Sequence, residues 1–289
     1  IIRKAKDIST LFEDEIWMLF QKMGFEELNR GYDFNIDVAP KAETRIKPKQ
    51  IDVIAKDENN VFVIECKSRS TPTSISLRKD IADIKDNRAN IEKAINEYYG
   101  EKKKITFVIC TRNIRWSEND KADAKGAKII VWREKEISYF KKLADLIESA
   151  AKYQLFAIVH KGEKAIEIPA IPALKGKMGN NNYYLFMIQP EKLLKIAYVH
   201  HRSTIHLQKG YDEEEGNAYQ RMLNKPKLRS INKFITKGGY FANNIIVNFT
   251  YPPIFISRNK VEEIETGFLK LPPYYASARI IDVKNRLYG

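Results

Sequence analysis

The sequence of 289 residues has few of the side chains that usually bind metals or form covalent bridges: two cysteines and four histidines. Cys66 and Cys110 lie inside apolar runs, VFVIECK and ITFVICT, which predicts buried and reduced side chains rather than a disulfide. No CxxC or Cys/His spacing indicates zinc. His200, His201 and His206 lie close together, but no cysteine or carboxylate stands at ligand spacing, so a basic loop is favoured over a metal site.

Long hydrophobic runs are also missing. No apolar stretch approaches the roughly 18 residues of a membrane span, and no secretory signal is present, so we expect a cytoplasmic protein. Internal repeats and low-complexity tracts are absent as well. Hydrophobic residues make up 44% of the chain, enough for a packed core. The start at Ile1, without a methionine, leaves open a fragment of a longer protein.

Positive charge is present in excess and is unevenly distributed. The formal net charge is +13. Residues 1–150 carry 29 basic and 26 acidic side chains, whereas residues 151–289 carry 21 and 11. This balance favours a polyanionic partner, with nucleic acid ahead of a membrane surface, and the asymmetry supports a division of labour between the two halves.

The first half has the hydrophobic patterns of an α/β (α+β) domain with a mixed sheet and helices on both faces. Ser9 or Thr10 is expected to cap its first helix, which would end near Met23. The expected strands are residues 51–55, 61–67, 105–111 and 127–132. The expected later helices are residues 79–99 and 138–153.

The second half has the pattern of an α+β domain built from short strands. The expected strands are LFAIV (155–159), YYLFMI (183–188), KIAYV (195–199), NNIIVNF (243–249) and PIFIS (253–257). Helices are expected near 191–195 and 217–237. We therefore divide the chain into domains at 1–153 and 154–289.

The stretch QIDVIAKDENNVFVIECKS (50–68) brings unusual charge to two apolar strands. Side chains alternate along a strand, so Glu65 and Lys67 face the same way. If the two strands form a hairpin, Asp52 reaches the same end of the sheet. Converging carboxylates are costly unless a cation joins them, and oxygen ligands suit Mg²⁺ or Mn²⁺. The alternative is a surface ion pair, but the strand VFVIE is very apolar for an exposed edge.

This layout resembles the PD-(D/E)xK restriction-endonuclease-like superfamily, especially its Mrr-like and Holliday-junction-resolvase-like branches, over residues 8–150. The resemblance rests on a helix bearing a glutamate, then an aspartate in QIDVIA, then the ECK strand. It implies that Asp52 and Glu65 bind the metal and that Lys67 assists the attacking water. The usual proline or glycine-rich segment before the aspartate is replaced by KPKQID.

Two further residues join this candidate catalytic set. The family glutamate falls on Glu13 in FEDEIW, not on Glu15. The alternative for Glu13 is an ordinary acid near a helix N-terminus, stabilised by the helix dipole. Gln50 lies two residues before Asp52 on the same face and is expected to hold water or phosphate.

The region 180–289 resembles the DGQHR-domain family, whose core is ParB-like and which is associated with DNA modification. The resemblance rests on YQR, a basic helix, GGYF, NNIIVN and a terminal IIDVKNRLYG in place of IIDGQHRLYG. The altered motif argues against nucleotide hydrolysis but leaves DNA or nucleotide binding open. The expected DNA- or nucleotide-binding residues are Gln220, Arg221, Lys225, Lys227, Arg229, Asp282 and Arg286. The alternatives are a solvated helix face for the three residues at 225–229 and an intramolecular ion pair between Asp282 and Arg286.

Two functions of different classes follow. The first is an Mg²⁺-dependent DNA endonuclease with a basic recognition domain, acting in restriction or phage defence, as a homodimer or with defence-system partners. The second is a regulator of a DNA-modification system that binds DNA or nucleotide without cutting. Metal-dependent cleavage separates the two.

Overall fold

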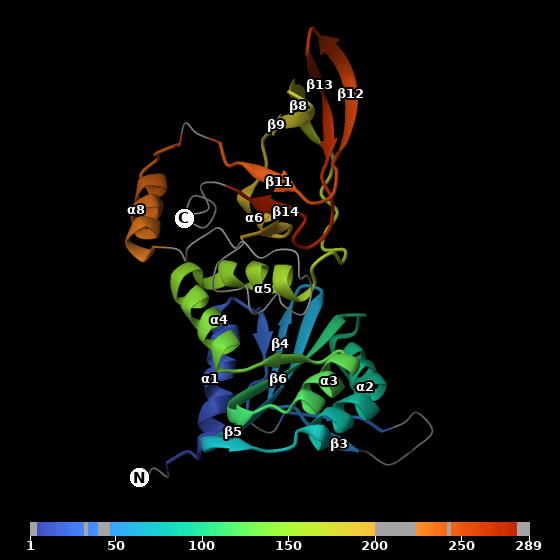
Figure 1. The fold of residues 1–289 in the computed structure, drawn as a ribbon, viewed down its shortest axis with the longest axis vertical. Coiled ribbons are helices and arrows are strands. Elements are labelled where there is room, and N and C mark those ends of the chain that lie inside the picture. The colour runs from blue at the N-terminus through green and yellow to red at the C-terminus, as the bar shows by residue number, and fades with distance from the viewer. Residues whose placement is uncertain (1–4, 32–33, 40–46, 200–223, 242–243, 282–289) are drawn as a thin grey trace. The chain divides into compact units, whose positions relative to one another are not determined.

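The computed structural model describes residues 5–31, 34–39, 47–199, 224–241 and 244–281. Contacts divide the chain into two compact units, Ile1–Asp145 and Leu146–Gly289 (Figure 1). The boundary predicted after residue 153 falls inside a helix, α5 (Ala151–Val159). Within the described residues, no helix has the length and apolar character that crossing a membrane requires.

The first unit is built on a five-stranded mixed sheet in the order β1-β4-β5-β6-β7, which confirms the predicted fold class. Its strands are β1 (Glu27–Leu28), β4 (Val53–Asp57), β5 (Asn60–Ser74), β6 (Lys104–Arg115) and β7 (Ile130–Trp132). The pairs β1–β4 and β4–β5 are antiparallel, whereas β5–β6 and β6–β7 are parallel. Two short strands, β2 (Asn35–Asp37) and β3 (Pro48–Gln50), pair beside this sheet.

Helices cover both faces of the sheet. On one face, α2 (Arg78–Tyr99) and α3 (Glu118–Gly126) pack on strand residues such as Val63 and Phe107. On the other face lie α1 (Ile8–Lys22) and α4 (Glu134–Ile147), joined by stacked rings of Phe20, Trp132 and Phe140. Cys66 and Cys110 are buried and unbridged on adjacent strands, as predicted.

Several boundaries differ from the sequence prediction. Helix α1 is capped by Asp7, whose Oδ1 accepts the Thr10 N–H at 2.8 Å, rather than by Ser9 or Thr10. Strand β5 continues well beyond Lys67 because its second half pairs with the long β6 across a bulge. Strand β4 begins only at Val53, so Asp52 occupies the bend that leads into it.

The second unit begins with a short 3₁₀ turn (Glu148–Ala150) and α5. It holds a four-stranded antiparallel sheet, β12-β13-β8-β9, and a three-stranded sheet, β10-β14-β11. The strands are β8 (Ile171–Met178), β9 (Asn181–Phe186), β10 (Ala197–Tyr198), β11 (Val247–Phe249), β12 (Ile254–Val261), β13 (Ile264–Lys270) and β14 (Ala278–Ile280). The remaining described helices are α6 (Pro190–Leu194) and α8 (Lys225–Thr236).

The strand predicted for LFAIV (155–159) is wrong, because these residues form the second half of α5. Leu155, Phe156 and Ala157 are all buried, so the apolar run reflects a helix surrounded by protein. The buried Gln154 fixes α5 to the end of β10. Its side chain donates to the Val199 carbonyl at 2.8 Å and accepts the Val199 N–H at 3.2 Å.

Candidate active site

The hairpin of β4 and β5 brings Asp52 and Glu65 together. Val53 pairs with Ile64, so Asp52 and Glu65 stand opposite each other one position further along. Asp52 is fixed in this place because its Oδ2 accepts the backbone N–H of Cys66 at 2.8 Å. Strand alternation then puts Glu65 and Lys67 on one face. The structure thus places all three predicted side chains at one end of the hairpin.

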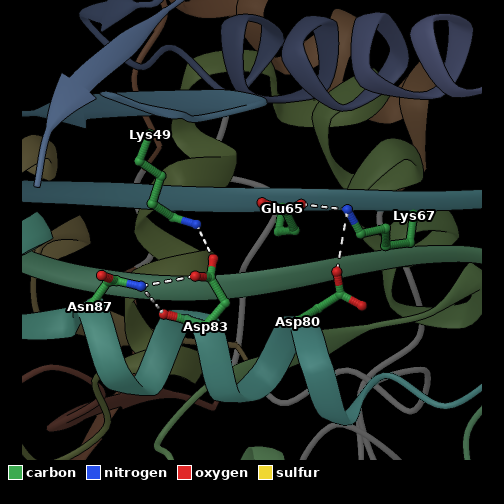
Figure 2. Close-up of polar contacts among 6 residues, drawn as sticks. All are labelled: Lys49, Glu65, Lys67, Asp80, Asp83 and Asn87. Carbon is green, nitrogen blue, oxygen red and sulfur yellow. Dashed lines mark hydrogen bonds and ion pairs between the residues drawn. The ribbon is translucent and has the colours of Figure 1, made fainter. Parts of the chain in front are cut away.

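Lys67 is held between two carboxylates. Its Nζ lies 2.5 Å from Glu65 Oε1 and 3.5 Å from Oδ1 of Asp80, in the first turn of α2 (Figure 2). Lys67 therefore has one acidic partner on its own strand, Glu65, and a second on the helix that covers this face, Asp80. Sequence reasoning missed Asp80, because its position in a highly charged helix gives no sign of the partner.

A second lysine lies on the other side of Glu65. Lys49 of β3 forms an ion pair with Asp83 of α2 (Figure 2). Asp83 is itself oriented by Asn87, whose Nδ2 donates to Asp83 Oδ1 at 2.8 Å and to its carbonyl oxygen at 2.9 Å. Lys49 belongs to the segment KPKQID, and nothing in the sequence distinguishes it from the neighbouring Lys47.

The two glutamates of α1 have separate environments. Glu15 pairs with Arg112 and with Lys141, at 2.9 Å from Lys141 Nζ. Burial raises the pKa of Glu15, but the hydrogen bonds from these two cations lower it overall. Glu13 instead has a raised pKa, caused by burial and then by the negative charges of Asp7 and Glu65. The structure therefore places Glu13 beside the carboxylate pair and Glu15 in an ion-pair network.

Glu13 and Asp52 also line the same cavity, of about 230 Å³. Its other lining residues are Asp14, Trp17, Asn29, Arg30 and Gly31. A space of this kind beside two acidic side chains gives solvent a route to Asp52.

Electrostatics in the site favour added positive charge. Burial raises the pKa of Asp52, and the negative charge of Glu13 adds to this effect. The hydrogen bond from the Cys66 N–H lowers the pKa but does not outweigh burial. Burial also raises the pKa of Glu65, and the charge of Asp52 adds to the effect. For Lys67, burial lowers the pKa, but the Glu65 carboxylate outweighs it and the pKa rises above its usual value. The ammonium is therefore charged, and the two carboxylates repel each other.

The buried Asn29 holds the backbone on which Asp52 sits. Its Nδ2 donates to the Asp52 carbonyl at 3.2 Å and to the Gly31 carbonyl at 3.0 Å, while its Oδ1 accepts the Ile54 N–H at 3.1 Å. The indole N–H of Trp17 donates to the Asn29 carbonyl at 2.8 Å. These contacts link the second half of α1, the loop that carries Gly31 and the bend at Asp52. The sequence offered no signal for this role.

Gln50 ends β3 and is exposed, paired across the short ladder with Asn35. Within the described ranges, no three or more His, Cys, Asp or Glu side chains are arranged as a metal-binding group. The pair Asp52 and Glu65 nevertheless has the chemistry that a divalent cation requires: hard oxygen donors, partial burial and mutual repulsion that a cation relieves. These two residues would hold such a cation.

The residues predicted to bind DNA or nucleotide fall into two groups. Lys225, Lys227 and Arg229 lie on α8, where they are exposed around the buried Leu228 and Ile231. The others lie outside the described residues: Gln220, Arg221, Asp282 and Arg286, together with His200, His201 and His206.

No protein-family model matches the sequence, and no curated protein matches it significantly. Three solved structures are similar in part. A protein of unknown function, AF1548, is 21% identical over 53% of this chain and 77% of its own, with a TM-score of 0.35. Protein VC1899 from Vibrio cholerae is 13% identical over 48% of this chain and 32% of its own, with a TM-score of 0.34.

The third similar structure is the small subunit of the heterodimeric restriction endonuclease R.BspD6I. It is 14% identical over 52% of this chain and 77% of its own, with a TM-score of 0.32. At these identities and TM-scores, none of the three neighbours says what this chain does.

Proposed function

We propose that the protein is an Mg²⁺-dependent DNA endonuclease that hydrolyses phosphodiester bonds. The observation that supports this most is the hairpin register, which sets Asp52 opposite Glu65 with Lys67 two residues further on the same face. An acidic pair beside an ammonium is also what the resemblance to PD-(D/E)xK enzymes implies, and this agreement supports the proposal. The basic second unit, with Lys225, Lys227 and Arg229 exposed, would supply DNA binding, in restriction or phage defence.

Each residue of the site has a distinct task in this proposal. Asp52 and Glu65 hold the cation, which when bound supplies Lewis-acid stabilisation of the phosphate. Lys67 orients the attacking water and offsets negative charge that develops on the phosphate oxygens. Glu13 accepts a hydrogen bond from water at the site, through the cavity that it shares with Asp52. Preorganised charges of this kind contribute about 3 kcal/mol or more each to transition-state stabilisation.

The test is plasmid cleavage in Mg²⁺ or Mn²⁺ by wild type, Asp52→Ala and Lys67→Met. The matched control is Lys85→Met, which removes an exposed lysine from α2. We expect cleavage by wild type and Lys85→Met, and a loss of about 100-fold or more in the other two. Equal cleavage by all four proteins would refute the assignment.

A second candidate is a DNA-binding regulator that does not cut. It is favoured by the concentration of positive charge in residues 151–289 and by the exposed basic side chains of α8. Its signature is binding that weakens steeply with salt, with no products in either metal. Such a result would leave the hairpin carboxylates as part of a scaffold.

A further inference from the structure

Helix α2 directs two carboxylates toward the strand that carries Glu65 (Figure 2). Asp80 and Asp83 are three residues apart, so they lie close together on the helix surface. Asp80 is 3.5 Å from the ammonium of Lys67, and Asp83 pairs with Lys49. Each lysine that flanks Glu65 therefore has an acidic partner on the helix.

The lysines are partly buried, so these partners matter more than in a surface ion pair. The side chain of Lys49 is 16% exposed and that of Lys67 is 30% exposed. The positive charge of Lys49 acts on both Asp52 and Glu65, whose pKa values it lowers. The Lys67 ammonium thus contacts Glu65 directly, and Lys49 lies on the other side of the same carboxylate (Figure 2).

That closeness creates a competition. An ammonium at 2.5 Å from Glu65 Oε1 occupies an oxygen that a divalent cation would use. A lysine with no other acceptor has to lose an ion pair before the cation can bind. A lysine that also has an aspartate on α2 keeps one partner and its place in the site.

We propose that Asp80 and Asp83 are positioning residues, which hold Lys67 and Lys49 against α2 and so free Asp52 and Glu65 to bind a divalent cation. This inference rests on the proposed function, because it assigns the cation to that carboxylate pair. Asn87 supports the arrangement by fixing Asp83 with two hydrogen bonds.

The experiment measures Mn²⁺ binding without DNA, from the loss of the free-ion electron paramagnetic resonance signal. Wild type is compared with Asp80→Asn and with the control Asp86→Asn. Both substitutions remove one negative charge from α2. At about 100° per residue, however, Asp86 lies opposite the isoleucine stripe of that helix, whereas Asp80 lies beside it. We expect Asp80→Asn to weaken Mn²⁺ binding about tenfold and Asp86→Asn less than twofold.

A double-mutant cycle separates positioning from simple attraction of the cation by negative charge. In a Lys67→Met background the ammonium is gone, so adding Asp80→Asn should change Mn²⁺ affinity less than twofold. An equal loss of affinity in both backgrounds would overturn the positioning role, because Asp80 would then act as a charge alone. The Asp83→Asn and Lys49→Met pair is expected to behave in the same way.

The outcomes also separate this inference from the proposed function. Mn²⁺ binding that depends on Asp52 but shows no coupling between Asp80 and Lys67 overturns the inference alone. Coupled Mn²⁺ binding without DNA cleavage supports the inference and refutes the nuclease. A wild-type protein that binds no Mn²⁺ overturns both.

Discussion

Asn29 offers a direct test of how the fold holds the candidate site, through the variant Asn29→Ala. The side chain is 7% exposed and makes three hydrogen bonds, to the carbonyls of Gly31 and Asp52 and from the N–H of Ile54. Ala removes all three bonds and leaves the backbone groups without that partner.

The expected loss of stability can be worked out from these bonds. Ile54 is 1% exposed, so its unpaired N–H costs about 1–3 kcal/mol. The two donated bonds add about 0.5–1.5 kcal/mol each. The free energy of unfolding of the first unit should therefore fall by about 2–6 kcal/mol. A change of 1 kcal/mol shifts the melting temperature of a domain of this size by about 2–4 °C, so Tm should fall by about 4–24 °C.

Thermal unfolding measures this loss of stability. DNA cleavage well below Tm measures whether the bend at Asp52 is displaced while the protein is still folded. The matched control is Asn119→Ala, which truncates an exposed asparagine at the start of α3. We expect cleavage by Asn29→Ala to drop at least tenfold while the protein is folded, because small displacements of a catalytic group cost about that much or more. A Tm within about 1 °C of the control, with normal cleavage, would refute the assigned role.

Three other substitutions have distinct expected results. Glu13→Gln should lower cleavage at least tenfold without loss of stability. Glu15→Gln should lower the free energy of unfolding in urea by about 1 kcal/mol and leave cleavage unchanged. An equal loss of cleavage in the two variants would contradict the separate roles of the two glutamates. Burial raises the pKa of Asp52 above the ordinary value of 3.8, so the folded state binds the proton more tightly. The stability advantage of Asp52→Asn over wild type should therefore grow as pH rises from about 3.8 through the folded pKa, and a constant difference would oppose this. Gln154→Leu should lower unfolding free energy by about 2–4 kcal/mol, because the Val199 N–H and carbonyl lose their partner; no change in urea unfolding would refute it.

The strand hairpin was predictable because its pattern combines two independent signals. An apolar strand of period two requires Glu65 and Lys67 to share a face, whatever the rest of the fold does. The turn between the strands fixes which residue stands opposite Glu65, and here the short turn at Glu58 and Asn59 brings Asp52 there. Both signals are local, so the arrangement of the hairpin can be predicted without knowledge of tertiary contacts.

The error at 155–159 has the opposite cause. Five consecutive apolar residues fit a buried strand as well as a buried helix, because periodicity disappears when every side is covered. The polar Gln154 just before the run was the available clue. It is 1% exposed and bonded to Val199, so it is a buried polar residue whose partner lies 45 positions away.

The acidic residues of α2 could be predicted only in part. The stripe of Ile81, Ile84, Ile91 and Ile95 fixes the rotation of the helix, so Asp80 had to lie beside the sheet and Asp86 away from it. The stripe does not fix the position of α2 along the direction of β5, and that position decides whether Asp80 contacts Lys67. It is set by the packing of the isoleucines on Val63 and Phe107, a tertiary property with no local pattern. The second lysine, Lys49, depends in addition on β3, whose place comes from its pairing with β2. The geometry of the candidate site on this hairpin is thus local in origin, whereas the ion pairs that hold its lysines depend on the whole unit.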